Sequence, residues 1–418
     1  MGFNFDLPVI IDGTGSCSEL TGDDPDNVCC EEIVVKKPEI LISAKGSAIF
    51  NGFNAVLSPT YGITHSRLED MGFDDNFTDY ITSITKHTVS VSDGTPVGGV
   101  IAKSDPVASE YGENVFDSAY FAHLERITLM KGAGADFVLL RNFDKLWDMR
   151  AGVLAAKSVD MPVFVTMNTD DEGKSESDTD FIAALITLQA LGADAFGIEC
   201  DMGIEETCRL IQKAFTHSEI PLIAAVDLLD ADKAELDKLY ESGVSVYLDL
   251  PRRLYKTGAD SAKGSTQDTS DLSEKDQNYK TDLSKSIKYL SGKKPLFDPD
   301  SEKDSYAAAI YREAFFLPEY PEFSEPLVCD YDMSDEIIDF DDEAVNAIYV
   351  NLNTTFDAAY LADNAIMSKL PFAVHTDDAT ILEAALRYYQ GRLIVDSHCG
   401  IDESIVAALS KKYGAVLY

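Results

Sequence analysis

Short apolar runs alternate with amphipathic stretches along the first 255 residues of the chain. Each run is apolar on both faces of an extended segment, which is typical of strands buried in a parallel sheet. The eight runs are 8–12, 54–58, 98–102, 136–140, 162–166, 195–199, 221–225 and 246–250. Between most of them, apolar residues recur at i, i+3 and i+4, and this spacing predicts helices.

The predicted helices before two of these runs end in Gly-Ala-Asp, at 134–136 and 192–194. A glycine just past a helix suits the left-handed conformation that ends many helices. Eight strand-helix alternations predict an α/β fold, the (β/α)8 TIM barrel. A doubly wound open sheet is the alternative fold.

The pattern changes after the barrel segment, 1–255. Residues 256–304 are rich in Ser, Asp and Lys and bury too little apolar surface to offset chain entropy. We expect 256–326 to be a polar linker with a helical segment at 305–316. Residues 327–418 read as a small C-terminal α/β unit, with strands at 347–352, 371–376, 392–397 and 415–418.

The net negative charge of the chain argues against two classes of binding partner. The chain has 73 acidic and 34 basic residues, a formal net charge of −39 at pH 7. Such a surface repels nucleic acid and anionic membranes, so we expect neither as a partner. The chain has no apolar run long enough to span a bilayer and no basic, cleavable start. Its seven cysteines are odd in number and scattered, which indicates free thiols and a cytoplasmic location.

In a (β/α)8 barrel the active-site residues lie at the C-terminal ends of the strands, which together form the mouth of the barrel. The candidate ligand-binding residues at these ends carry charges of both signs, which suits a small polar molecule. They are Asp12, Thr60, Arg141, Asn142, Asn168 and Glu199, with Cys200 as a candidate metal ligand.

Five segments carry a family resemblance: VIIDGTGS (9–16), KPEILISAKGSAIFNGFNAVLSPTY (37–61), GADFVLLRNFDKLWDMRAG (134–152), VDMPVFVTMNTDDEGKS (159–175) and LGADAFGIECDMG (191–203). In order and spacing they resemble the homocysteine S-methyltransferase family, which includes the homocysteine-binding barrel of cobalamin-dependent methionine synthase. The resemblance covers roughly residues 5–255. It implies methyl transfer to a thiol such as homocysteine, from a donor of the methylcobalamin or S-methylmethionine type, with a corrinoid protein as a partner. It also implies a zinc ion held by three cysteine thiolates, with an open position for the substrate sulfur.

This sequence departs from the family pattern at the ligand positions. The segment 197–200, Gly-Ile-Glu-Cys, matches the motif of the first zinc cysteine, but Leu-Asp-Leu-Pro at 248–251 stands where the family has two consecutive cysteines. Arg141 replaces the glutamate that binds the substrate amino group. Asp12 and Thr60 are retained.

Three readings of the site follow. A relocated zinc site of Cys29, Cys30 and Cys200 would preserve methyl transfer. A barrel without zinc would instead be a non-catalytic binding or assembly subunit. In the third reading, Arg141 and Asn142, together with Arg252, hold a different, anionic small molecule.

Overall fold

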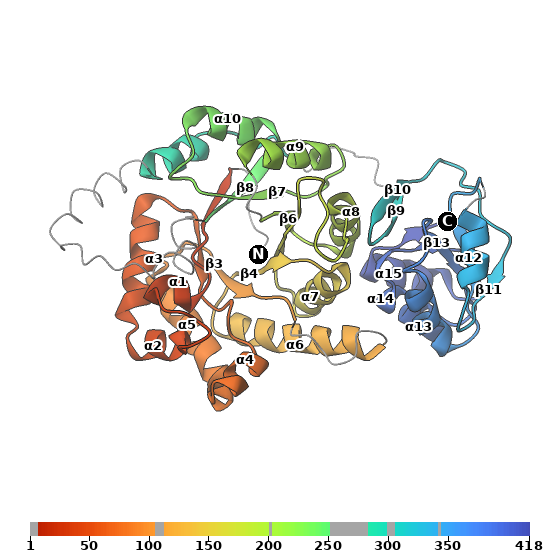
Figure 1. Ribbon diagram of the computed structural model, residues 1–418, viewed down its shortest axis with the longest axis horizontal. Coiled ribbons are helices and arrows are strands. Elements are labelled where there is room, and N and C mark those ends of the chain that lie inside the picture. The colour runs from red at the N-terminus through yellow and green to blue at the C-terminus, as the bar shows by residue number, and fades with distance from the viewer. Residues whose placement is uncertain (1–6, 105–112, 200–202, 251–282, 299–305, 342–343) are drawn as a thin grey trace.

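The computed structural model describes residues 7–104, 113–199, 203–250, 283–298, 306–341 and 344–418. Eight parallel strands form a closed barrel in sequence order, with β8 hydrogen-bonded to β1 (Figure 1). They are β1 (Val9–Asp12), β2 (Ala55–Ser58), β3 (Val97–Ile101), β4 (Phe137–Phe143), β5 (Val163–Met167), β6 (Ala195–Ile198), β7 (Leu222–Val226) and β8 (Val244–Asp249). All eight predicted strands are confirmed, and the closed barrel decides against the open sheet.

The barrel interior is filled by side chains that point inward from alternate strand positions. Ile11, Leu57, Leu139, Phe164 and Leu248 are all buried in this inner cluster. Branched and aromatic side chains make the interior a packed core rather than a channel. The polar side chains that could bind a ligand therefore lie at the ends of the strands, outside this packed interior.

Helices surround the barrel and join successive strands. They are α1 (Cys17–Thr21), α2 (Cys30–Lys36), α3 (Glu39–Asn51), α4 (His65–Asp70), α5 (Phe77–Val91), α6 (Glu113–Gly132), α7 (Leu146–Ser158), α8 (Phe181–Leu191), α9 (Ile204–Phe215) and α10 (Lys233–Glu241). Gly134 and Gly192 have φ values of 100° and 92°, so both glycines adopt the expected left-handed conformation. Among the described residues, no helix is long and apolar enough to cross a membrane.

Part of the predicted linker packs against the barrel. Residues 283–291 form a helix whose Leu283, Ile287 and Leu290 are buried. The Lys293 ammonium after this helix pairs with Asp237 of α10 at 2.7 Å. Residues 256–282 and 299–305 of the predicted linker lie outside the described residues.

The helix predicted at 305–316 is wrong. Strands β9 (Ala307–Ile310) and β10 (Glu313–Phe316) form an antiparallel hairpin, and β9 also pairs with β14 (Gly391–Arg392). Alanine-rich sequence favours a helix by propensity. All four residues of β9 are buried, however, so tertiary packing against α8 and β14 overrides that local preference.

The C-terminal unit is a five-stranded parallel sheet in the order β11-β12-β13-β15-β16. Its strands are β11 (Leu327–Val328), β12 (Ile348–Asn351), β13 (Phe372–His375), β15 (Ile394–Val395) and β16 (Val416–Leu417), and its helices are α12 (Ser334–Asp341), α13 (Thr355–Asn364), α14 (Ala379–Tyr388) and α15 (Glu403–Tyr413). The strand predicted at 392–397 divides into β14 and β15, which belong to different sheets.

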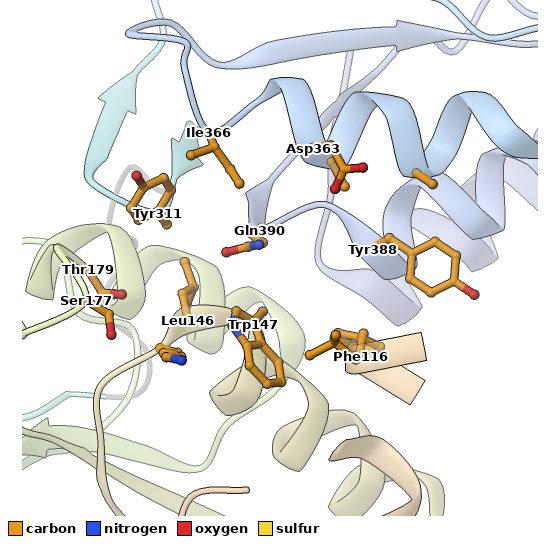
Figure 2. A pocket seen from close by; sticks show the side chains of 14 residues that line it. Phe116, Leu146, Trp147, Ser177, Thr179, Tyr311, Asp363, Ile366, Tyr388 and Gln390 are labelled. Carbon is orange, nitrogen blue, oxygen red and sulfur yellow. The ribbon is translucent and has the colours of Figure 1, made fainter. Parts of the chain in front are cut away.

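A buried arginine joins this unit to the barrel. Arg150 of α7 donates to the Leu386 carbonyl at 2.7 Å and the Arg387 carbonyl at 3.1 Å, and also to the Tyr389 carbonyl. These are carbonyls that the end of α14 leaves unpaired, so a cation there satisfies them and suits the helix dipole. Burial lowers the pKa of Arg150 to about 10. Beside this contact, side chains of the two units line an open cavity of about 280 Å³ (Figure 2).

Candidate active site at the barrel mouth

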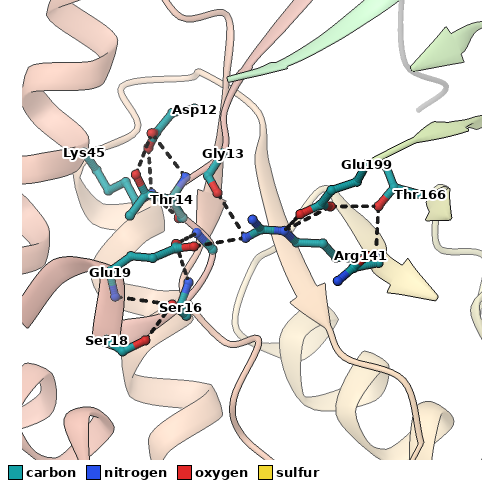
Figure 3. Close-up of polar contacts among 12 residues, drawn as sticks. Asp12, Gly13, Thr14, Ser16, Ser18, Glu19, Lys45, Arg141, Thr166 and Glu199 are labelled. Atoms are coloured by element: carbon teal, nitrogen blue, oxygen red, sulfur yellow. Dashed lines mark hydrogen bonds and ion pairs between the residues drawn. The ribbon is translucent and has the colours of Figure 1, made fainter. Parts of the chain in front are cut away.

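A buried ion pair crosses the barrel mouth from the end of β4 to the end of β6 (Figure 3). The Arg141 Nε lies 2.9 Å from Glu199 Oε1 and 3.2 Å from Glu199 Oε2. The Thr166 hydroxyl on β5 donates to Glu199 Oε2 at 3.1 Å. Charge-assisted bonds of this kind are short and strong, so the glutamate has a fixed orientation.

A second carboxylate approaches the same arginine from the loop after β1. Arg141 Nη1 donates to the Gly13 carbonyl at 3.2 Å and lies 3.5 Å from Glu19 Oε1. Glu19 also accepts the Gly15 and Ser16 backbone N–H groups, at 2.6 and 3.0 Å, in the capping box of α1. The guanidinium is therefore neutralised from two sides within the protein.

Asp12 is held by a lysine that is fully buried. Lys45 Nζ on α3 lies 2.6 Å from Asp12 Oδ2 and 2.7 Å from the Thr14 carbonyl. The Thr14 hydroxyl donates to Asp12 Oδ1 at 2.9 Å. Asp12 and Lys45 thus fix the loop that carries Gly13 toward Arg141 (Figure 3).

Asp249, at the end of β8, is a buried carboxyl with a raised pKa. Its Oδ1 accepts the Leu228 backbone N–H at 2.9 Å. Burial raises the pKa of Asp249 to about 8, with smaller contributions from Asp12 and Asp227. This side chain is therefore mostly protonated and uncharged at neutral pH. The next residue, Leu250, has no metal-binding atom.

The other three predicted ligand-binding residues have different environments. The Thr60 hydroxyl donates to the Val100 carbonyl at 2.8 Å and accepts the Val100 N–H at 2.9 Å, so it ties the end of β2 to β3. Asn142 has a φ of 60°, and its buried Oδ1 has no hydrogen-bond partner among the described residues. Asn168 is exposed after β5.

The cysteines of the predicted relocated zinc site lie in and beside helix α2, except Cys200, which lies outside the described residues. Cys29 Sγ is 3.6 Å from Glu31 Oε2, and Cys30 Sγ is 3.5 Å from the Val28 carbonyl. Burial raises the pKa of both thiols, which favours the protonated form over the thiolate that binds metals. Within the described residues, no three His, Cys, Asp or Glu side chains are grouped as a metal site.

The described residues at the zinc positions do not fit the three-thiolate set that the resemblance implies. Asp249, a neutral carboxyl, and Leu250, an aliphatic residue, stand where the family resemblance puts the two consecutive cysteines. Catalytic zinc is held by three protein ligands.

Sequence reasoning missed three residues that shape the mouth: Glu19, Lys45 and Thr166. Two had a local signal. Ser16 and Glu19 form the S-x-x-E pattern of a capping box, and Lys45 is a lone cation in an otherwise apolar helical stretch. Thr166 had none, because it meets Glu199 only when β5 and β6 pair.

Comparisons with known proteins agree with this fold. The family model described as homocysteine S-methyltransferase matches residues 9–259. A methionine synthase of Mycobacterium leprae (strain TN) is 23% identical over 418 residues, covering 91% of this chain and 34% of that protein. One of Mycobacterium tuberculosis (strain ATCC 25618 / H37Rv) is 25% identical over 224 residues, covering 49% of this chain and 19% of that protein. The chain thus spans about a third or less of the length of these curated relatives.

A solved structure shares the barrel. The metallated form of a homocysteine methyltransferase from Escherichia coli superposes with a TM-score of 0.50 at 16% identity, covering 60% of this chain and 94% of that one. This likeness concerns the fold alone. The family match extends over more than half of the chain, from the first barrel strand to beyond the last. The chain belongs to the homocysteine S-methyltransferase family.

Proposed function

We propose that this barrel is a binding member of the homocysteine S-methyltransferase family that does not carry out the zinc-thiolate reaction. The observation that carries the proposal is the Arg141–Glu199 ion pair, 2.9 Å long and buried across the mouth. Arg141 stands where the family resemblance puts the glutamate for the substrate amino group. A guanidinium at this position repels an ammonium group instead of binding it.

The charges of the described mouth also bear on the ligand. Arg141 is already paired with Glu199 and Glu19, and Lys45 with Asp12. Cations engaged in this way have little attraction left for an added anion, which weakens the prediction of an anionic ligand at Arg141. Arg252, the other cation of that prediction, lies outside the described residues. A small polar molecule held by hydrogen bonds suits this mouth better than an anion. The buried Asn142 Oδ1 has no hydrogen-bond partner among the described residues and would accept a bond from such a molecule once its side chain turns toward the mouth.

Metal content tests the proposal directly. We expect protein purified without chelator to hold far less than one zinc per chain, and Cys200→Ala to leave that content unchanged. The matched variant is Asp249→Cys with Leu250→Cys, which restores the family's two consecutive cysteines. It should gain zinc, and adding Cys200→Ala should abolish the gain. Zinc near one per wild-type chain, lost on Cys200→Ala, would contradict the proposal.

The second candidate function is methyl transfer to homocysteine or a similar thiol, which family membership favours. It is measured as homocysteine-dependent methyl transfer from methylcobalamin or S-methylmethionine, with and without a corrinoid protein as partner. Turnover that requires Cys200 would establish this function, with Cys29→Ser and Cys30→Ser testing the relocated zinc site. Absence of turnover in wild-type protein with each donor supports the binding role.

A further inference from the structure

The cavity between the barrel and the C-terminal unit has the chemistry of a small-molecule site. Its volume is about 280 Å³, and its aromatic lining comes from Phe116, Trp147, Tyr311 and Tyr388. Ligand sites favour domain boundaries and combine aromatic walls with a few polar groups. Both features are present here.

The side chains of three polar residues of this cavity make no hydrogen bond or ion pair with described residues. The Lys145 ammonium forms no ion pair with a described carboxylate and lies 6.0 Å from the centre of the Trp147 ring. The Asp363 carboxylate and the Gln390 amide make no hydrogen bond or ion pair with described residues.

These groups come from opposite walls. Figure 2 shows the Gln390 amide between α13, which carries Asp363, and the start of α7, where Leu146 and Trp147 lie. Lys145 is the residue before α7 and makes no side-chain capping bond. Its positive charge therefore adds to the unpaired N–H groups of the first turn of α7, and both favour an anionic group.

The walls are held in place by bonds through the β9–β10 hairpin and by a direct ion pair between the two units. Asp180 N–H donates to the Tyr311 carbonyl at 2.9 Å, and Arg312 Nη2 donates to the Ile366 carbonyl at 2.8 Å. Arg387 pairs with Asp117 of α6 at 2.6 Å. A cavity whose walls are fixed before binding costs a ligand less ordering entropy.

We propose that this cavity binds an aromatic small molecule that carries both an acidic and an amino group. The ring stacks against Trp147, the acidic group pairs with Lys145 at the start of α7, and the amino group pairs with Asp363. Gln390 hydrogen-bonds to the ligand between these two charges. The loops after β4 and β5 supply Lys145 and Thr179, so the site lies at the same end of the barrel as the mouth.

Trp147 is the one tryptophan of the chain, so its fluorescence reports occupation of the cavity. The probes are L-phenylalanine, with its charges on one side of the ring, and 4-(aminomethyl)benzoate, with its charges at opposite ends. We expect a saturable change in Trp147 emission with at least one probe. Ligand-observed NMR on the full chain provides the second measurement of binding.

Matched comparators separate the three contacts of the better probe. For 4-(aminomethyl)benzoate they are 4-methylbenzoate without the amine, benzylamine without the acid, and 4-(aminomethyl)cyclohexanecarboxylate without the aromatic ring. For L-phenylalanine they are 3-phenylpropanoate, phenethylamine and cyclohexylalanine. Each comparator should bind about tenfold more weakly than its parent probe, which corresponds to a loss of about 1.4 kcal/mol of binding free energy.

Variants assign each charge to its residue. Lys145→Gln should weaken binding of the probe about tenfold and leave binding of the comparator without the acid unchanged. Asp363→Asn should also weaken binding of the probe about tenfold, and it should leave binding of the comparator without the amine unchanged. Lys86→Gln on α5 is the matched control and should change nothing. Both tested side chains are exposed, so the variants should fold, as far-UV circular dichroism would verify. Absence of saturable binding by both probes in both measurements, or comparators that bind as tightly as the probe, would overturn the proposal.

Discussion

Substitution of Asp249 by asparagine should remove a pH-dependent loss of stability from the barrel. The folded protein raises the pKa of this carboxyl to about 8 because the side chain is buried at the end of β8. In the unfolded chain the same group has a pKa of about 3.9. Between these values the unfolded chain releases the proton and the folded chain keeps it, so stability falls as pH rises.

The magnitude follows from the two pKa values. Relative to a neutral side chain, Asp249 lowers the free energy of unfolding by about 1.5 kcal/mol at pH 5, about 4 kcal/mol at pH 7 and about 5.5 kcal/mol at pH 9. Asparagine carries no charge, and its carbonyl oxygen accepts the Leu228 N–H as the carboxyl does. Asp249→Asn should therefore gain about 4 kcal/mol over wild type between pH 5 and pH 9.

The assay is urea unfolding at pH 5, 7 and 9, followed by the fluorescence of Trp147, which lies on α7 of the barrel. Comparing the two proteins across pH cancels any constant effect of the amide on packing. Asp75→Asn, at an exposed carboxyl in the short turn before α5, is the control and should give a difference that is constant with pH. A difference between wild type and Asp249→Asn that varies by less than about 1 kcal/mol over this range would refute the reasoning.

Three further predictions concern groups that the tertiary structure brings together. Arg141→Ala should lower the free energy of unfolding by about 3–5 kcal/mol because it leaves Glu199 buried without its cation. Adding Glu199→Ala should recover part of that loss in a double-mutant cycle, and strictly additive effects would contradict the coupling. Arg150→Ala should leave carbonyls of α14 unpaired and speed limited proteolysis between the two units, with Arg150→Lys intermediate, whereas an unchanged cleavage rate would argue against this role. Gly197→Ala should abolish soluble expression because the added Cβ would lie 1.8 Å from the Ile223 carbonyl oxygen, and a soluble variant of wild-type stability would disprove that close approach.

The barrel could be predicted from the sequence because each of its elements has a local signature. A strand buried on both faces is a continuous apolar run, as in 136–140, and a glycine such as Gly192 marks a helix end whatever the helix packs against. The order of these signals decided the fold class and the position of the mouth. The family resemblance rests on the same linear order.

The contacts within the mouth could be decided only by the tertiary structure, because charge and burial depend on residues far apart in the chain. Arg141 and Glu199 are 58 positions apart and meet because β4, β5 and β6 are neighbours in the barrel. The strand β9 is alanine-rich and helical by propensity, yet burial against α8 makes it extended. The sequence determined which residues follow the barrel strands. Packing brought Glu19, Lys45 and Thr166 to the mouth and decided which groups there are paired, protonated or left without a partner.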